Sequence, residues 1–193
     1  YNTLNSIKFA ALIRGEKELG GLIGDFVELL QATISKKGTF LTVADEFHIL
    51  NNYVHLQEFR YQGSFRVRYE TDEGAEGCYI PRLILQPLVE NAILHGIDMK
   101  EKNGEIILKA KLEQNRLRLF VIDNGRGMTK EQIDTLLHSK AKKTNGLSAI
   151  GVPNIKERLE LYYGEEGGLV YQSSESGTTA EIFLPAKKEL DRN

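Results

Sequence analysis

Residues 88–96 of the sequence read Leu-Val-Glu-Asn-Ala-Ile-Leu-His-Gly. On a helix, Asn91 and His95 stand one turn apart at the margin of an apolar stripe, and Glu90 lies about 100° around the axis from Asn91. The amide oxygen of Asn91 suits Mg2+, which prefers oxygen ligands and keeps several waters. The carboxylate of Glu90 can orient or deprotonate a nucleophile. A surface helix that stops at Gly96 explains the same run, so these residues alone leave both interpretations open.

Downstream, an apolar strand over residues 117–122 leads directly into Asp123-Asn124-Gly125-Arg126-Gly127-Met128. An aspartate at a strand end can accept a hydrogen bond from an exocyclic amine such as that of adenine. Gly125 and Gly127 let the backbone turn sharply and approach a ligand closely. An ordinary Asp-Asn-Gly turn remains the alternative.

Two further glycine segments follow. Residues 146–154 read Gly-Leu-Ser-Ala-Ile-Gly-Val-Pro-Asn and run into a helix that Pro153 can start. Backbone N–H groups at such a helix start favour phosphate, although a capped helix after a loop explains the segment equally well. Gly177-Thr178-Thr179 enters the last strand, where the hydroxyl of Thr179 is a candidate for the base pocket; a simple turn is the alternative.

Working outward, the periodicity predicts an α+β chain. We expect a helix from Pro81 to Gly96, since proline suits a first helical turn. Alternating patterns predict strands at 65–70, 106–110, 117–121, 169–172 and 179–184, and helices at 130–137 and 153–163. Together these elements predict that a mixed α+β domain follows the N-terminal helices.

Residues 1–62 are predicted to be helical, with one helix from Leu19 to Ile34 and a second over 43–62. The two would form a helical hairpin, and their wide apolar faces predict a homodimeric four-helix bundle. The boundary between this part, residues 1–62, and the second domain, residues 63–193, is placed near Gly63. His48 and His55 share a face of the second helix, where a structural role is expected.

Composition narrows the class of protein. The chain has 193 residues, 41% hydrophobic content and a formal net charge of -2, which does not suggest a nucleic-acid partner. Cys78 is the single cysteine, so no internal disulfide is expected and a reducing, cytoplasmic setting is the default. Neither a signal peptide nor an apolar run of membrane-spanning length is found. Walker A, HExxH and Rossmann motifs are also absent.

The order of these motifs is more specific than any one of them. Glu-Asn-x-x-x-His-Gly on a helix, Asp-x-Gly-x-Gly after a strand, a glycine pair before a helix and Gly-Thr near the last strand occur in that sequence. Residues 80–185 thereby resemble the ATP-binding domain of the GHKL superfamily, which includes gyrase, ninety-kilodalton heat-shock chaperones, histidine kinases and mismatch-repair ATPases. The resemblance implies an α/β sandwich with a mixed sheet that binds ATP with Mg2+.

The resemblance also implies roles for individual residues. Asn91 would be the Mg2+ ligand, Asp123 the adenine contact, Glu90 the catalytic carboxylate, and residues 128–150 a mobile lid. Its Lys140, Lys142 and Lys143 are candidates to reach phosphate, and ordinary solvated loop lysines are the alternative for each. Further nucleotide contacts are expected from His95, Gly125, Gly127, Met128, Gly146, Gly151 and Thr179.

The N-terminal segment Tyr-Asn-Thr-Leu-Asn-Ser-Ile at residues 1–7 is similar to the one that follows the phosphoacceptor motif of LytS-like sensor histidine kinases. The acceptor histidine of that group would lie three residues before Tyr1, so the chain is read as a piece of a longer protein that should bind ATP without phosphorylating itself at that site. The resemblance implies phosphotransfer to a response regulator receiver domain, and a membrane-anchored parent with this part on the cytoplasmic side.

Two alternatives stay open. A GHKL ATPase of the gyrase or mismatch-repair type would use Glu90 to activate water. A degenerate domain would bind a partner without nucleotide, against which Asn91, Asp123, Gly125 and Gly127 all argue.

Overall fold

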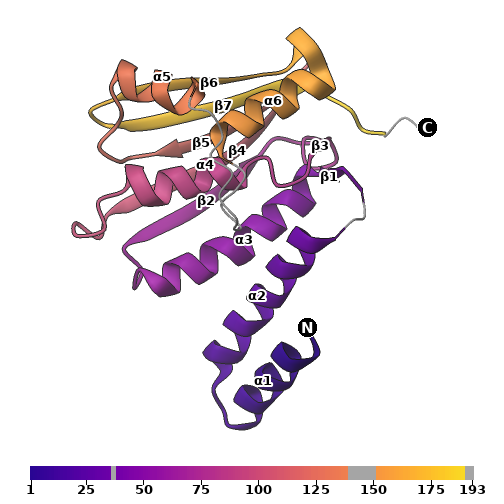
Figure 1. Cartoon of the computed structure of the whole chain (residues 1–193), viewed down its shortest axis with the longest axis vertical. Coiled ribbons are helices and arrows are strands. Elements are labelled where there is room, and N and C mark those ends of the chain that lie inside the picture. Colours follow the sequence, from indigo (N-terminus) through magenta and orange to yellow (C-terminus); the bar gives the residue numbers. More distant parts are fainter. Residues whose placement is uncertain (36–37, 139–150, 190–193) are drawn as a thin grey trace.

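The computed structural model describes residues 1–35, 38–138 and 151–189. A helical extension leads into an α/β domain, as Figure 1 shows. The helices and strands are α1 (Asn2–Ile13), α2 (Lys17–Ile34), β1 (Phe40–Thr42), α3 (Val43–Arg60), β2 (Phe65–Thr71), β3 (Tyr79–Pro81), α4 (Gln86–Asn91), the π-helix η1 (Ala92–Gly96), β4 (Gly104–Glu113), β5 (Arg116–Asp123), α5 (Lys130–His138), α6 (Val152–Tyr163), the 3-10 turn η3 (Gly164–Glu166), β6 (Gly168–Ser174) and β7 (Gly177–Pro185).

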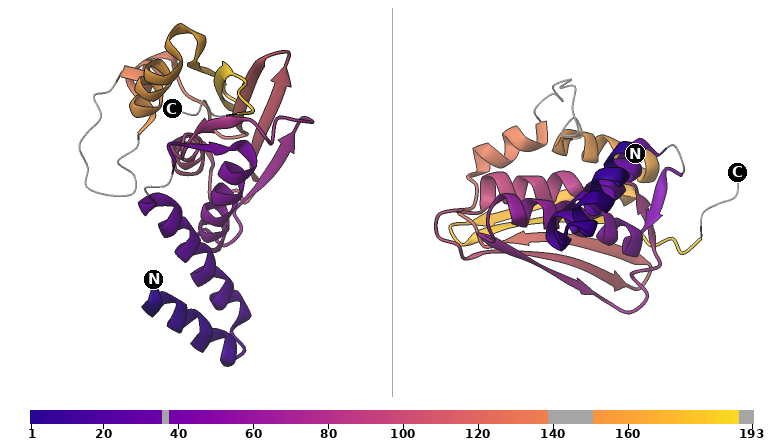
Figure 2. Two further views of the ribbon diagram at one scale, coloured as in Figure 1. Left: turned by 90° about the vertical axis from the view of Figure 1, so that its right-hand side faces the viewer. Right: turned by 90° about the horizontal axis from the view of Figure 1, so that it is seen from below.

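The main sheet has the strand order β2-β4-β5-β7-β6. Strands β2 and β4 are parallel, and the other neighbours are antiparallel, so the sheet is mixed as predicted. Alternate residues of the central strands are buried, and Figure 2 shows the helices on one side of the sheet. One face of each strand therefore builds the core, and the predicted fold class is confirmed.

The helical extension differs in detail from the expected hairpin. A turn at Gly15, with φ of +83°, separates α1 from α2 and sends α1 back along it. The two helices are in close contact, because a Cβ at Gly20 would come within 2.4 Å of the Leu12 side chain. The predicted second helix is present as α3, whose Leu50 and Val54 belong to the same core as the sheet.

The structure corrects the predicted start of the helix that carries Asn91. Pro81 lies in β3, which pairs with β1, and the proline in the first helical turn is Pro87. Between them, the backbone N–H groups of Leu83 and Leu85 donate to the carboxylate of Glu46 at 2.8 and 3.1 Å. Leu83 also has a φ of +54°, outside the helical region, so the helix begins only after this segment.

This segment, residues 82–85, joins several parts of the molecule. Arg82 donates to the carbonyls of Ala32 and Ser35 at the end of α2, at 3.1 and 3.0 Å. Arg158 on α6 donates to the Arg82 carbonyl at 2.7 Å. Glu46, which is fully buried, connects α3 to the same segment. The end of α2 and the faces of α3 and α6 therefore meet immediately before α4.

Candidate functional site

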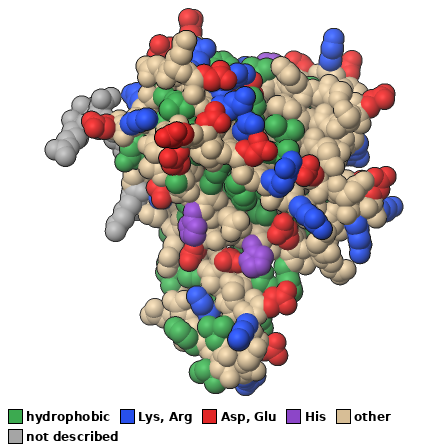
Figure 3. Space-filling view, turned by 180° about the vertical axis from the view of Figure 1, so that it is seen from behind, with side chains coloured by type: hydrophobic (Ala, Val, Ile, Leu, Met, Phe, Trp, Pro, Cys, Tyr) green, Lys and Arg blue, Asp and Glu red, His purple; other side chains and the backbone are tan. Residues whose placement is uncertain are grey.

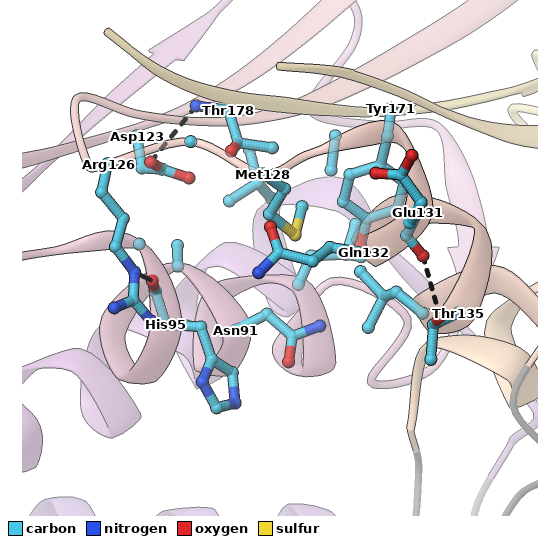
Figure 4. Close-up of a pocket in the computed structure, with 17 residues that line it drawn as sticks. Asn91, His95, Asp123, Arg126, Met128, Glu131, Gln132, Thr135, Tyr171 and Thr178 are labelled. Carbon is cyan, nitrogen blue, oxygen red and sulfur yellow. Dashed lines mark hydrogen bonds between the residues drawn. The ribbon is translucent and has the colours of Figure 1, made fainter. Parts of the chain in front are cut away.

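A cavity of about 470 Å³ lies between the helix α4–η1, the sheet and α5, which is within the usual size range of a small-molecule site. Its floor is formed by strand residues of the central sheet, and its walls carry the polar side chains shown in Figure 4. Of the predicted site residues, those that line it are Asn91, His95, Asp123, Gly127 and Met128.

Asp123 ends β5 and is 7% exposed. Its Oδ1 accepts from the backbone N–H groups of Gly125 at 2.9 Å and Thr178 at 3.3 Å. Burial raises the pKa of this carboxyl group, while the two backbone bonds oppose the rise. Since both bonds go to Oδ1, the other oxygen is available to accept a hydrogen bond from a ligand in the cavity.

The backbone around Asp123 is packed so closely that a side chain would not fit at three of its glycines. A Cβ at Gly125 would lie 2.1 Å from the carbonyl oxygen of Gly96, and one at Gly177 would lie 1.9 Å from that of Asp123. Gly127 has a φ of +69°, and a Cβ there would lie 1.8 Å from the carbonyl oxygen of Ser174. The glycines therefore bring three backbone segments together at one wall of the cavity.

The helix that carries Asn91 changes its winding at the site. It continues from α4 into the π-helix η1, in which Ile97 N donates to Ala92 O at 3.0 Å. π-Helical turns occur frequently at functional sites. Arg126 donates from Nε to the carbonyl of His95 at 2.9 Å and from its backbone N–H to that of Gly96 at 3.1 Å. The end of η1 is thereby held against the segment that follows Asp123.

Glu90 and Asn91 face different surroundings. Asn91 lines the cavity, whereas Glu90 does not. Glu90 accepts from Gln86 Nε2 at 2.9 Å, and its charge contributes to raising the pKa of Tyr53 on α3. Burial raises the pKa of Glu90 as well, with Gln86 opposing. The predicted catalytic carboxylate therefore lies on the side of the helix that faces α3.

The remaining predicted residues are placed as follows. The threonine that lines the cavity is Thr178, whereas Thr179 points to the opposite face of β7. Gly151 is the N-cap of α6 and does not line the cavity. Gly146 and the lid lysines lie outside the described residues. The described part of the expected lid contains α5, whose Gln132 and Thr135 line the cavity.

The residues that line or support the cavity and were not predicted include Arg126, Tyr171 and Ser173. The Tyr171 hydroxyl is buried and has no hydrogen-bond partner among the described residues. Burial raises the pKa of Tyr171, and the nearby Asn91 amide opposes this rise. Alternation along β6 carries a usable signal, because Tyr171 and Ser173 share the face of β6 that turns toward the core.

The two histidines of α3, His48 and His55, have structural contacts. His48 Nε2 lies 3.2 Å from Glu28 Oε2, and His55 pairs with Asp25, so both connect α3 with α2. Figure 3 shows the histidines beside acidic side chains on this surface.

Together, the mixed sheet, the helices on one face and the glycine-lined cavity at Asp123 define a nucleotide-binding domain of the GHKL type. Residues 80–188 match the family described as "Histidine kinase-, DNA gyrase B-, and HSP90-like ATPase", and residues 1–65 match the family "Histidine kinase". The chain belongs to the histidine kinase-, DNA gyrase B- and HSP90-like ATPase family.

Curated relatives agree with the resemblance found in the sequence. The sensor histidine kinase YesM of Bacillus subtilis is 31% identical over 98% of this chain, and the sensor protein LytS of Staphylococcus epidermidis is 29% identical over all of it. The predicted membership of the LytS-like group is thus confirmed. The chain spans 32% of the length of each of these relatives.

Solved structures show the same fold. The catalytic domain of the histidine kinase ThkA has a TM-score of 0.56 and 16% identity, with 78% of this chain and 96% of that one covered. The complex of ThkA with its response regulator TrrA contains a chain with a TM-score of 0.55 and 16% identity, covering 99% of this chain and 60% of that one. In the part of this chain that the structure describes, no helix has the length and apolarity to cross a membrane.

Proposed function

We propose that this chain is the ATP-binding catalytic core of a two-component sensor histidine kinase. The parent protein would transfer the γ-phosphate of ATP to a histidine and then to an aspartate of a response regulator receiver domain. The observation that carries the proposal is the cavity at Asp123, where a buried carboxylate oxygen that accepts no hydrogen bond from the described residues matches the exocyclic amine of adenine.

Mg2+ would be held at Asn91. Its amide lines the cavity one helical turn from His95, and among the described residues no three His, Cys, Asp or Glu side chains converge on a metal position. An ion bound by one amide oxygen would take its other ligands from phosphate and water, which is the usual coordination of Mg2+ beside a nucleotide. His95, which also lines the cavity, would contact the phosphates.

Calorimetric titration with ATP, with and without Mg2+, tests the nucleotide site directly. We expect saturable binding that tightens when Mg2+ is present. Replacing Asn91 with Ala should leave metal-free binding in place and remove most of the Mg2+ dependence, because the amide ligand is lost. No binding at millimolar ATP would contradict the proposal and favour a degenerate partner-binding domain.

Glu90 is proposed to orient or deprotonate the incoming imidazole. Its position toward α3 rather than the cavity favours a nucleophile supplied by the helical part over a water molecule beside ATP, so it speaks for a kinase and against an ATPase of the gyrase type. Burial raises the pKa of Glu90, which makes its carboxylate a stronger base than that of an exposed glutamate.

Glu90→Gln should leave the ATP dissociation constant unchanged and slow phosphotransfer by about 100-fold, the usual contribution of a general base. The measurement is single-turnover transfer from labelled ATP in a chain extended at its N-terminus to carry the acceptor histidine. Glu157→Gln on the exposed side of α6 is the matched control. Transfer at the wild-type rate would remove Glu90 from this role.

The partners follow from the same proposal. Homodimerisation through the N-terminal helices is supported by large exposed apolar side chains on α1 and α2, which include Phe9, Ile13 and Ile34 at 61%, 87% and 64% exposure. Figure 3 shows apolar side chains gathered at the far end of this extension. A monomeric mass in light scattering would contradict the dimer.

The parent protein is proposed to be membrane-anchored, with this part in the cytoplasm.

A further inference from the structure

The segment Asn124–Met128, called the strap below, forms one wall of the cavity and packs against the end of β6. The backbones touch there, since a Cβ at Gly127 would overlap the carbonyl oxygen of Ser174. The backbone N–H of Met128 donates to Ser173 Oγ at 2.7 Å. This bond attaches the strap to β6 through a side chain that does not itself line the cavity.

Ser173 Oγ has two further polar neighbours. It lies 3.2 Å from the carbonyl oxygen of Gly177 and 2.8 Å from Thr178 Oγ1. A hydroxyl group has one proton and two acceptor positions. The carbonyl of Gly177 can only accept, whereas the Thr178 hydroxyl can donate or accept, so all three contacts are satisfied together only when the Ser173 proton goes to Gly177. Met128 N–H and the Thr178 hydroxyl then fill the two acceptor positions of Ser173.

This arrangement fixes the direction of the Thr178 hydroxyl. Its proton is used in the bond to Ser173, so the oxygen presents acceptor positions to the cavity that Thr178 lines. The neighbouring Asp123 contributes another acceptor, and Figure 4 shows the two side chains along one wall. A wall made of two acceptors suits a base edge with an exocyclic amine and opposes a base edge with a carbonyl.

We propose that Ser173 is a positioning residue that sets the base specificity of the nucleotide site. It holds the strap in place and orients the Thr178 hydroxyl so that Asp123 and Thr178 both accept from the ligand. The inference rests on the proposed function, because it assumes that a nucleotide base occupies the Asp123 end of the cavity. Without Ser173, the Thr178 hydroxyl can rotate and donate to a carbonyl.

The test compares ATP with inosine triphosphate, which carries a carbonyl where adenine carries its amine. Dissociation constants are measured by calorimetry on the full chain. Ser173→Ala should weaken ATP binding roughly five- to tenfold, as expected for a lost hydrogen bond, and leave inosine triphosphate binding unchanged or improved, so that the preference for ATP falls. Ser173→Thr, which keeps the hydroxyl, should retain the preference. Ser174→Ala is the control, since its exposed hydroxyl bonds only within the β6–β7 turn.

Thr178→Val gives a second measurement that keeps the bond between the strap and Ser173. It should lower the preference for ATP, and adding Ser173→Ala to it should lower the preference no further, because both changes remove the same interaction. Two results would overturn the inference: equal weakening of both nucleotides in Ser173→Ala, or additive losses of preference in the double variant. Neither result would contradict the proposed function, because the wild-type chain would still bind ATP. If the wild-type chain binds neither nucleotide, both the proposed function and the inference about Ser173 fail.

Discussion

Asp123→Asn is expected to abolish measurable ATP binding, with a dissociation constant raised by at least about 100-fold. An asparagine can keep its oxygen on the Gly125 and Thr178 N–H groups, which occupy Oδ1 in the wild type. Its amide nitrogen then replaces Oδ2 and points a donor at the donor of the base. The charge-assisted bond is lost and a buried donor is left unpaired, which together cost roughly 3–6 kcal/mol.

The fold should survive this change. Burial raises the pKa of Asp123, so the charged form is not favoured by its surroundings and a neutral isostere fits the same space. Calorimetry therefore has to be paired with thermal unfolding without nucleotide, where the midpoint should shift by only a few degrees. Asp72→Asn, on the exposed turn after β2, is the control. Unchanged affinity in Asp123→Asn would show that the base binds elsewhere.

Glu46→Gln is expected to change how stability depends on pH. Burial raises the pKa of Glu46 to about 7, while the backbone bonds from Leu85 and Leu83 and the charge of Arg158 oppose the rise. A carboxyl group with a raised folded-state pKa gives stability that is complete below its unfolded pKa, near 4.5, and is lost as the pH rises toward 7. The loss amounts to about 3 kcal/mol at 1.36 kcal/mol per pKa unit.

Urea unfolding at pH 5 and pH 8 measures this effect. A glutamine has no proton to lose, so the Glu46→Gln chain should gain stability relative to wild type between the two values, by up to the same roughly 3 kcal/mol. Glu73→Gln, on an exposed turn, should follow the wild type. Parallel curves for wild type and Glu46→Gln would show that Glu46 ionises near its ordinary pKa despite its burial.

Residue periodicity was enough to predict most of the α/β domain. The strands that build the sheet alternate strictly, for example Leu117, Leu119 and Val121 on β5, and the glycines of the Asp123 segment occur where a side chain would collide. Local signals of this kind depend on neighbours in the sequence, and they identified Asn91, His95 and Asp123, which the structure brings to one cavity.

The errors arose where distant residues decide the local structure. Pro81 has the features of a helix start, but Glu46 on α3 accepts from the backbone N–H groups of the residues that follow it, and the helix begins only at Gln86. The choice of Thr179 over Thr178 was avoidable, since Ala180 and Ile182 mark the buried face of β7 and place Thr178 on it. The π-helix η1 and the support by Ser173 depend on contacts made across the fold, which no local pattern carries.

The hydrogen bond between Thr178 N and Asp123 joins residues 55 positions apart. This separation determines at which stage of folding the site is complete. Strands β6 and β7 are the last elements of the described chain, so the carboxylate has only half of its backbone donors until that hairpin docks on β5. Contacts between distant residues form slowly in folding, because the loop between them must close first. During synthesis, the Asp123 end of the cavity is therefore completed only after the β6–β7 hairpin has left the ribosome.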